Sequence, residues 1–445
     1  LLCSYRLTDI YVRGAVGEVI ALTFFPIALI GIVEVLYGQP QRWGWLTAGF
    51  SALLLSHNIS FLLGCLMLLG FLALRIRTLR AQPQRLKAIV KATVAAIGLC
   101  AFFLFPMLEQ MSAQTLYVHS YASSTQLEDM ALNAWQFTTQ QMVFGVAGNT
   151  LDPSSAMTTN LGWLIPLLPL TGFFLFQKPK EEKDRFVHHC LILGYGLMLL
   201  CSRCVPWEYL MWLRIIQFPW RLMAPASVLL SVAAAVIAVE FFGRWRRLGI
   251  SCCMIAGLIT SLVPLVQVME RSLVLNLDAP YSVLLDGSLL DPSYGDSFFI
   301  RTEIAGADYL PVATLDYRTA SRAVQEQSGA EISDTILRQG TTTRFELQEH
   351  QGQQWLTLPI TWYKGYAASG LNRDGTVQEL TLRADPATRR VQVYDPSGTI
   401  IAIELRYEGT LIQRGSEGLT LISIGMLGWL GIRKKRKMKE KRSEN

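Results

Sequence analysis

Long apolar stretches recur along the chain, and short polar segments separate them. A membrane helix needs about 20 mostly apolar residues, and somewhat fewer where the bilayer is locally thin. Seven stretches fit this requirement: 16–36, 91–107, 161–176, 187–201, 222–242, 250–268 and 419–432. The pattern predicts a mainly α membrane protein whose helices form a polytopic bundle.

One further apolar run, 45–74, is too long for a single ordinary span. It is interrupted near its middle by Ser56, His57 and Asn58. We therefore expect two short helices that meet at an outer turn, which raises the total to nine membrane segments.

Basic residues test this count, because cytoplasmic loops collect Lys and Arg. They gather in the segments 75–91, 178–185, 244–247 and 433–442, whereas residues 108–160 contain none. Placing all four basic segments inside requires an odd number of spans from an outside start, and nine spans satisfy this. The tail 433–445 can also be explained as an electrostatic anchor to anionic lipid, and both explanations place it in the cytoplasm.

This topology predicts a polytopic membrane domain over 1–269 with an external loop at 108–160. Within that loop, scattered apolar positions over 127–144 favour an interfacial helix. Residues 270–416 are predicted to form an extracytoplasmic β-rich domain, followed by a final transmembrane helix at 417–432. Alternating apolar and polar positions predict its strands at 343–347, 355–360, 378–382, 390–394 and 400–407.

Composition agrees with a membrane protein. Hydrophobic residues make up 51% of the 445 positions and charged residues 17%, against about 25% in soluble domains. An apolar content this high excludes a disordered chain and a nucleic-acid-binding arm, so membrane lipid is the expected partner. The chain begins with Leu1 rather than Met, and we expect an N-terminal part to be missing from it.

The cysteines and histidines give no sign of a metal centre. None of the eight cysteines lies in 270–416, so that domain is not predicted to be disulfide-stapled. Cys201 and Cys204 form a CxxC, for which small residues at a helix end are favoured over a redox pair. No second CxxC accompanies it and the five histidines are scattered, so no structural zinc is expected. No cofactor is assigned, although a divalent cation held by carboxylates remains open.

Ionisable residues beside the first span are candidate site residues, because such groups are costly near a membrane. Asp9 and Arg13 are four apart and would share a helix face, and Glu18 follows one turn deeper. The three residues could form a polar entrance for an anionic substrate. They could equally form an interfacial ion pair that only fixes the helix.

Two further groups of residues are candidate site residues, and each also has a purely structural explanation. The turn at His57 and Asn58 could face substrate in a wet cavity, or it could only cap the following helix. Glu109, just past the end of a predicted span, could act as a general base or metal ligand. The alternative for Glu109 is an ordinary solvated carboxylate.

A fourth candidate set is Gln217, Trp220 and Arg221, in a segment predicted to lie outside despite its arginines. The guanidinium of Arg221 suits phosphate oxygens, and Trp220 could stack on a sugar or pack on lipid. A Trp–Arg belt at the membrane interface would explain the same residues. The sequence has no nucleotide-binding glycine loop and no GxSxG, which argues against an ATP-driven pump, a dinucleotide enzyme and an α/β hydrolase.

Several short motifs together resemble a known group of proteins. They are the stretch 5–18, the Ser-His-Asn turn at 56–58, Phe-Pro-Trp-Arg at 218–221, Asp-Tyr-Leu-Pro at 308–311, Leu-Pro-Ile-Thr-Trp-Tyr-Lys-Gly-Tyr at 358–366, and the last span with its basic tail. Their order resembles that of bacterial 6-pyruvoyl-tetrahydropterin-synthase-related and YfhO-like multi-pass membrane proteins, which look like members of the GT-C glycosyltransferase superfamily. Pterin chemistry is not implied, because the histidine set that a zinc-dependent synthase needs is not found.

The resemblance implies a lipid-dependent reaction. A sugar on a polyprenyl-phosphate carrier would enter from the outer leaflet, and an acceptor hydroxyl of an envelope glycan or lipid would attack its anomeric carbon. The catalytic carboxylate of this superfamily lies on the first external loop, which we expect to be missing here, with Asp9 near its end. By resemblance, Arg221 would bind phosphate and Glu109 would be a second acidic group.

Three functions are compatible with these sequence features. The first is a GT-C-like glycosyltransferase acting outside the plasma membrane. The second is a non-enzymatic transporter, flippase or assembly protein for envelope lipids, and the third is a degenerate member with a structural role. A catalytic carboxylate on an external loop before Leu1 would favour the enzyme.

Overall fold

The computed structural model describes residues 3–116, 127–137, 157, 159–175, 181–245, 247–260, 266 and 323–443. The chain divides into two compact units. The first comprises Leu1–Cys100 and Thr125–Tyr281, and the second comprises Ala101–Ser124 and Ser282–Asn445.

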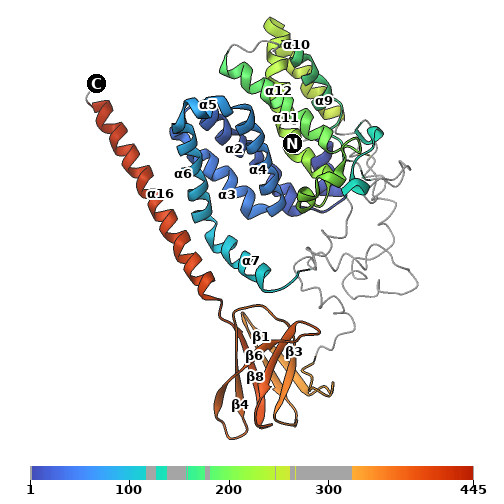
Figure 1. Ribbon diagram of the computed structural model, residues 1–445, viewed down its shortest axis with the longest axis vertical. Helices are drawn as coiled ribbons and strands as arrows, with labels where there is room; N and C mark the ends of the chain where they lie inside the picture. Colours follow the sequence, from blue (N-terminus) through green and yellow to red (C-terminus); the bar gives the residue numbers. More distant parts are fainter. Residues whose placement is uncertain are drawn as a thin grey trace. The chain divides into compact units, whose positions relative to one another are not determined.

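The first unit is a helical bundle (Figure 1). Its labelled α-helices are α1 (Ser4–Tyr11), α2 (Val16–Leu36), α3 (Gly44–Ser56), α4 (Asn58–Leu74), α5 (Ile76–Ala81), α6 (Pro83–Leu99), α9 (Leu164–Leu167), α10 (Gly172–Leu175), α11 (Glu182–Leu200) and α12 (Met223–Phe242). A further apolar helix covers Arg247–Thr260. Short 3-10 helices lie between them: η1 (Pro40–Arg42), η2 (Leu127–Met130), η3 (Ala134–Phe137), η4 (Leu168–Thr171), η5 (Trp207–Tyr209), η6 (Met211–Ile216), η7 (Pro219–Leu222) and η8 (Gly243–Trp245).

Helices α2 and α3 pack with their backbones in close contact. A Cβ atom on Gly31 would lie 2.3 Å from the Cα of Leu46, and one on Gly49 would lie 2.4 Å from the Cα of Ala28. Close approach through small residues is the usual way in which membrane helices associate, since lipid offers no hydrophobic driving force between them.

Three of the described helices are long and apolar enough to cross a membrane. They are Val16–Leu36, Pro219–Phe242 and Leu411–Arg433, with mean hydropathies of 2.5, 2.3 and 1.2. Helix α6 and the next helix, α7 (Ala101–Ala113), meet the same criterion only when they are taken together. The prediction of a mostly helical chain is confirmed, and some of its apolar helices could span a membrane, whereas the nine spans stay a prediction.

The run 45–74 forms two helices, as predicted, and the break falls at His57 between α3 and α4. The predicted span 91–107 was wrong in detail, because α6 ends at Leu99 and a separate helix begins at Ala101.

The predicted interfacial helix at 127–144 was also wrong over its described part. Residues 127–137 form the two 3-10 turns η2 and η3 rather than one helix. Backbone hydrogen bonds hold this segment against the end of α11, from Leu132 N to Cys201 O at 2.8 Å and from Arg203 N to Leu132 O at 3.0 Å. These bonds replace those of a regular helix, while residues 138–144 lie outside the described residues.

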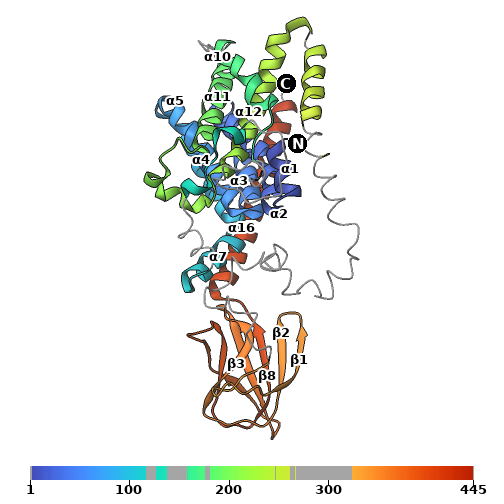
Figure 2. The ribbon, with the colours of Figure 1, turned by 90° about the vertical axis from the view of Figure 1, so that its right-hand side faces the viewer.

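The second unit contains a two-layer β domain, helix α7 and the long helix α16 (Leu411–Ser443). The strands are β1 (Ser333–Gln339), β2 (Thr342–Leu347), β3 (Gln354–Thr361), β4 (Tyr366–Asn372), β5 (Val377–Leu380), β6 (Leu382–Ala384), β7 (Arg390–Asp395) and β8 (Ile400–Tyr407). One sheet has the order β1-β2-β8-β4-β5 and the other β3-β7-β6, with all pairs antiparallel. Figure 2 labels β1, β2 and β8 of the first sheet and β3 of the second. Inward-facing apolar residues such as Phe345, Leu356, Val393 and Ile403 fill the space between them.

The predicted strands match this domain in part. Strands β2, β3, β7 and β8 confirm four predictions, whereas 378–382 divides into β5 and β6, which belong to different sheets. Strand β4 escaped prediction because its sequence, Tyr-Ala-Ala-Ser-Gly-Leu-Asn, lacks alternating large apolar residues. A Cβ on Gly370 would lie 3.0 Å from Ile400 Cδ1, so a larger residue there would require the Ile400 side chain to shift.

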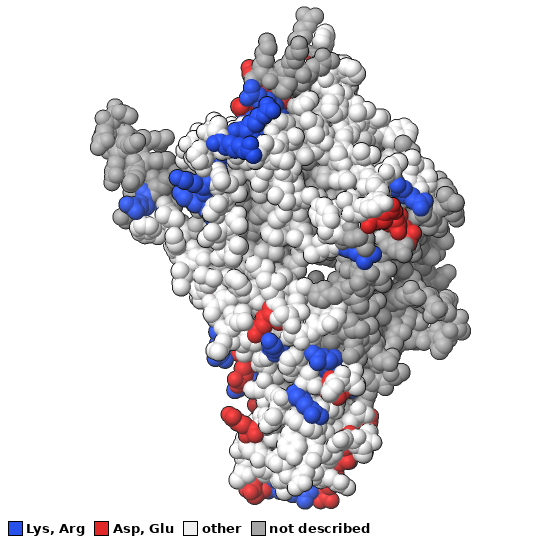
Figure 3. Space-filling model, in the orientation of Figure 1, with Lys and Arg blue, Asp and Glu red and all other residues white. Residues whose placement is uncertain are grey.

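Helix α7 lies beside the first part of α16, as Figure 2 shows. The backbone N–H of Phe102 donates to Thr420 Oγ1 at 3.0 Å, and the side chain of Gln110 exchanges two hydrogen bonds with the backbone of Lys364. On the face drawn in Figure 3, acidic and basic residues are interspersed over the β domain, whereas the helices present mostly uncharged surface. This distribution agrees with helices that contact lipid and a β domain that contacts water.

Candidate functional site

A buried ionic cluster forms where α1 turns into α2. Helix α1 ends with two bonds to the Thr8 carbonyl oxygen, from Val12 N at 2.9 Å and Arg13 N at 3.0 Å. Gly14 then takes φ +59°, the left-handed conformation that glycine adopts at helix ends. The resulting turn separates α1 from α2.

Arg13 lies between two carboxylates. Its Nη1 donates to Asp9 Oδ1 and lies 2.9 Å from Glu18 Oε2. The predicted i,i+4 contact between Asp9 and Arg13 is therefore present, and Glu18 joins it from the next helix. Asp9 is 0% exposed and Glu18 1%, so this is not an ion pair on the protein surface.

Glu18 has two further partners. The hydroxyl of Tyr5, itself buried, donates to Glu18 Oε1, and Arg221 Nε lies 3.4 Å from Glu18 Oε2. Tyr5 was not among the predicted site residues. Its position thirteen residues before Glu18 gives no periodic signal, because a turn rather than one helix brings the two together.

Arg221 enters the cluster from η7, far along the chain. Its Nη1 donates to Gln217 Oε1 at 2.5 Å and to the Ile216 carbonyl oxygen at 3.1 Å. Gln217 has φ +64°, a conformation that costs a non-glycine residue about 1 kcal/mol or more. The backbone of Gln217 is therefore strained, and the side chain of the same residue orients Arg221.

Trp220 does not form an exposed interfacial belt. It is buried, and its ring stacks on Phe218 with centroids 4.4 Å apart and an interplanar angle of 9°. The guanidinium of Arg221 lies 4.9 Å from the Phe218 ring centroid. In this arrangement Trp220 supports the arginine through Phe218, and stacking on a sugar would require it to move.

His57 caps α4. Its Nδ1 accepts the backbone N–H of Ser60 at 3.3 Å and lies 2.9 Å from the Ser60 hydroxyl. The cap is thus His57 itself, rather than Asn58 or Ser60, and α4 begins at Asn58. The same turn approaches the cluster, because a Cβ on Gly17 would lie 3.4 Å from His57 Cδ2.

On the charged side chains of the cluster, two polar atoms have no hydrogen-bond partner among the described residues. They are Asp9 Oδ2 and Arg221 Nε, whose contact with Glu18 is an ion pair without hydrogen-bond geometry. A buried polar atom without a hydrogen bond costs about 1–3 kcal/mol. The cluster therefore presents one buried acceptor and one buried donor that a bound molecule could satisfy.

Burial also changes the acidity of Asp9, which lies in α1 before the first candidate span. Loss of solvent, and then the charge of Glu18, raise the pKa of Asp9 to about 8. Arg13 and Arg221 oppose this change. Asp9 is therefore the carboxyl group of the cluster that binds a proton near neutral pH.

Glu109 belongs to the second unit. It lies on α7, where its Oε2 accepts a hydrogen bond from the Thr410 hydroxyl at 2.5 Å. Its observed role is to connect α7 to the segment between β8 and α16.

The described residues contain no group of three or more His, Cys, Asp or Glu side chains arranged to hold a metal ion. Cys201 is buried, Cys204 is exposed, and both are free thiols. A cavity of about 540 Å³ lies beside them at the end of α11, lined by Leu132, Phe137 and Arg203 among others. No residue of the ionic cluster lines this cavity.

Comparison with known proteins does not assign the chain to a family. No family model, curated protein or solved structure matches it.

The arrangement is suited to an anion that also carries hydroxyl groups. Arg13 and Arg221 supply positive charge, and Asp9 supplies a proton acceptor. Because the two arginines face two carboxylates, the cluster is neutral when all four groups are ionised. Protonation of Asp9 gives it one net positive charge.

Proposed function

We propose that this chain is an integral membrane protein that binds a phosphate-linked lipid sugar at the ionic cluster and transfers the sugar to an acceptor hydroxyl. The observation that carries the proposal is the buried pair of unsatisfied atoms, Arg221 Nε and Asp9 Oδ2. One is a donor suited to a phosphate oxygen, and the other is an acceptor suited to a hydroxyl proton.

The phosphate part of the proposal rests on the two arginines. Arg13 and Arg221 come from segments far apart in sequence and both contact Glu18. Guanidinium groups remain charged and bind phosphate oxygens in a fixed geometry. A polyprenyl-phosphate carrier would bring such a phosphate to the level of the membrane.

The sugar part rests on the resemblance to GT-C proteins. In the proposed step, the acceptor oxygen forms a bond to the anomeric carbon while its proton passes to Asp9. The bond from the anomeric carbon to the phosphate oxygen breaks, and its electron pair leaves with the lipid phosphate. Arg13 and Arg221 stabilise the phosphate charge that develops.

The basic segments give the proposed orientation. With 75–91, 178–185 and the tail 433–445 in the cytoplasm, the β domain lies outside the plasma membrane. There it would bind the envelope glycan or lipid acceptor. This scheme does not require a divalent cation. A cation bound by the carboxylates would be compatible with it.

A transfer assay tests the proposal. The full-length chain in lipid nanodiscs is given radiolabelled polyprenyl-phosphate sugars and envelope acceptors, and label transfer is followed. We expect transfer by the unaltered protein, loss with Arg221→Ala, and retention with Arg42→Ala, whose exposed guanidinium pairs with Glu34. Transfer that survives Arg221→Ala would contradict the proposal.

A non-enzymatic transporter or flippase is the second candidate. It is favoured by the hydrogen bond from Thr410 to Glu109, because that contact occupies the carboxylate expected to be the second acidic group of a glycosyltransferase. Lipid movement across proteoliposomes without any transfer, abolished by Arg221→Ala, would support this function instead.

A further inference from the structure

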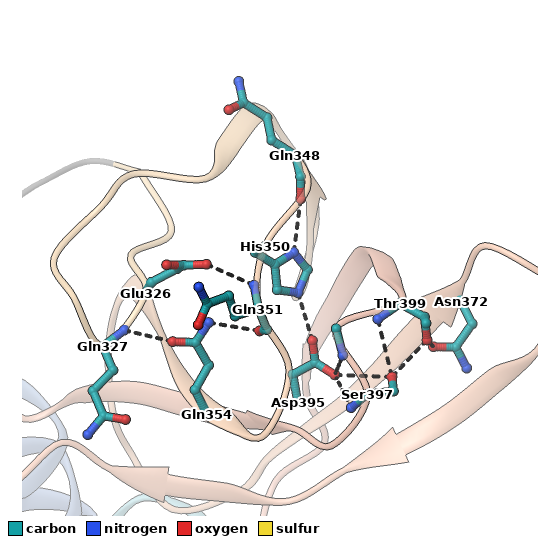
Figure 4. A network of polar contacts seen from close by, with 11 residues as sticks. Glu326, Gln327, Gln348, His350, Gln351, Gln354, Asn372, Asp395, Ser397 and Thr399 are labelled. Atoms are coloured by element: carbon teal, nitrogen blue, oxygen red, sulfur yellow. Dashed lines mark hydrogen bonds and ion pairs between the residues drawn. The ribbon is translucent and has the colours of Figure 1, made fainter.

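The β domain contains a buried histidine–aspartate pair that the proposed function does not use (Figure 4). His350 Nε2 lies 2.7 Å from Asp395 Oδ2, and the two side chains are 1% and 0% exposed. His350 lies in the connection from β2 to β3, and Asp395 is the last residue of β7. Buried charged or polar groups of this kind persist only where their hydrogen bonds are satisfied.

Both ring nitrogens of His350 face acceptors. Nδ1 lies 2.9 Å from the carbonyl oxygen of Gln348, which cannot donate, so Nδ1 must carry a proton. Nε2 faces the carboxylate of Asp395. A neutral imidazole carries only one N–H, and therefore only the doubly protonated ring can donate to both oxygens.

Asp395 also accepts hydrogen bonds on its other oxygen. Oδ1 accepts the backbone N–H groups of Ser397 at 2.9 Å and Gly398 at 3.0 Å, and the Ser397 hydroxyl at 3.3 Å. These bonds leave Oδ2 as the oxygen that faces Nε2 of His350. They also show that Ser397 is bonded to the aspartate and not to His350, so the three residues do not form a nucleophilic triad.

The pair joins two connections between the sheets. The chain crosses from one sheet to the other between β2 and β3, and crosses back between β7 and β8. The two connections touch through their backbones, because a Cβ on Gly352 would lie 2.6 Å from Gly398 N. A change at His350 would therefore act on both crossings at one end of the β domain.

The charges around His350 come from three directions. Asp395 faces it from β7, and Glu326, before β1, accepts the Gln351 N–H at 3.1 Å. That backbone hydrogen bond is the main cause that lowers the pKa of Glu326, and the charge of His350 acts in the same direction. Glu349, next in sequence, is exposed and paired with Arg373. Apart from Arg373, these charged side chains near His350 are negative.

We propose that His350 and Asp395 form a proton-dependent latch that holds the two inter-sheet connections together. With both ring nitrogens protonated, the latch is closed. When His350 loses one proton, the ring can donate to only one acceptor, and the Nε2 lone pair faces a buried carboxylate. The connections at 348–353 and 395–399 then separate more readily, so this end of the β domain changes with the pH of its compartment.

Hydrogen exchange on the full-length chain in nanodiscs tests the latch. Exchange of the amides of Gln351, Ser397 and Gly398 is followed from about pH 5 to about pH 8 and divided by the intrinsic exchange rate at each pH. We expect protection of these amides to fall about tenfold as pH rises, the effect of losing one charge-assisted hydrogen bond. In His350→Gln the protection should be lower and independent of pH.

Two further variants serve as a control and as a second test of the latch. Arg373→Ala removes a charge from the adjoining exposed pair and should keep the pH dependence, while Asp395→Asn should abolish it. Protection that does not change with pH in the unaltered chain would overturn the proposal. So would a pH dependence that survives in His350→Gln, since another group would then be titrating.

Discussion

Arg221 Nε lies 3.4 Å from Glu18 Oε2, and the two side chains are 8% and 1% exposed. This contact joins the first candidate span, Val16–Leu36, to the start of the second, Pro219–Phe242, across a sequence separation of about two hundred residues. Removing one member of a buried pair leaves the other uncompensated, which is more costly than the pair itself is stabilising.

Arg221→Ala should therefore weaken phosphate binding and fold stability together, whereas Arg221→Lys should weaken mainly binding. Lysine keeps the charge but loses the planar group that is held between Gln217 and Phe218. We expect a loss of about 10- to 100-fold in affinity for a polyprenyl-phosphate analogue with Arg221→Lys. Equal binding by Arg221→Lys and the unaltered chain would show that only charge matters.

Tyr5→Phe should destabilise the chain although it removes a single oxygen atom. The lost hydroxyl is a hydrogen-bond donor to a buried carboxylate, and such bonds contribute about 1.5–3 kcal/mol. Thermal unfolding in nanodiscs measures the effect. Tyr11→Phe, at a position 47% exposed, is the matched control and should leave the unfolding temperature unchanged.

Asp9 should make stability fall with rising pH. Its pKa is raised to about 8 in the folded chain, so its neutral form is favoured there over the ionised form. The stabilisation is complete below the ordinary pKa of an aspartate and is lost as pH rises to about 8. Asp9→Asn should remove this slope from the unfolding temperature, whereas Asn in place of the exposed Asp129 should not. An unchanged slope in Asp9→Asn would contradict the assignment.

Transfer activity should rise with pH because of Asp9, whereas stability should fall. If its carboxylate accepts the proton of the attacking hydroxyl, the rate rises with pH until Asp9 is ionised near pH 8. Asp9→Asn should abolish transfer while phosphate binding persists, because both arginines remain. Transfer that is flat across this range would exclude Asp9 as the base.

Part of the site could be predicted from sequence. Charged residues next to an apolar span stand out by composition, and the spacing of Asp9 and Arg13 gives their contact directly. The approach of Arg221 depends on how distant helices pack, and no local pattern encodes it. Tyr5 was missed for a related reason, since an aromatic residue at a span entrance is typical of the interface whether or not it binds a carboxylate.

In the fold, too, features with a local sequence signal could be predicted, whereas features that depend on distant pairing could not. The interruption at His57 predicted the break between α3 and α4, because polar residues within an apolar run are visible in the local sequence. Strand β4 pairs with β8, which is distant in sequence, and the division of 378–382 arises because β5 pairs with β4 in one sheet while β6 pairs with β7 in the other. Tertiary pairing decides such strands more than local preference does.

The His57 turn allows a test between its two predicted roles. His57→Ala removes the acceptor for Ser60 N–H and should cost about 1 kcal/mol, the usual effect of losing a helix cap. His57→Asn keeps an acceptor, so it should restore stability and retain phosphate binding. A stable His57→Asn variant that no longer binds phosphate would show that the ring itself contacts the ligand.

The packing of α2 on α3 gives a prediction that depends on neither proposal. Gly31→Ala places a methyl group 2.3 Å from the Cα of Leu46, and backbone atoms cannot yield as a flexible side chain can. We expect destabilisation of about 1–3 kcal/mol or failure to fold, as for other overpacked sites.

Gly196→Ala makes the same chemical change on α11, where no atom lies within 4 Å of the new Cβ among the described residues. There alanine should be neutral or slightly stabilising, since it favours a helix over glycine by about 1 kcal/mol. Thermal unfolding of both variants in nanodiscs separates the two cases, and equal unfolding temperatures would mean that α2 and α3 are not packed through Gly31.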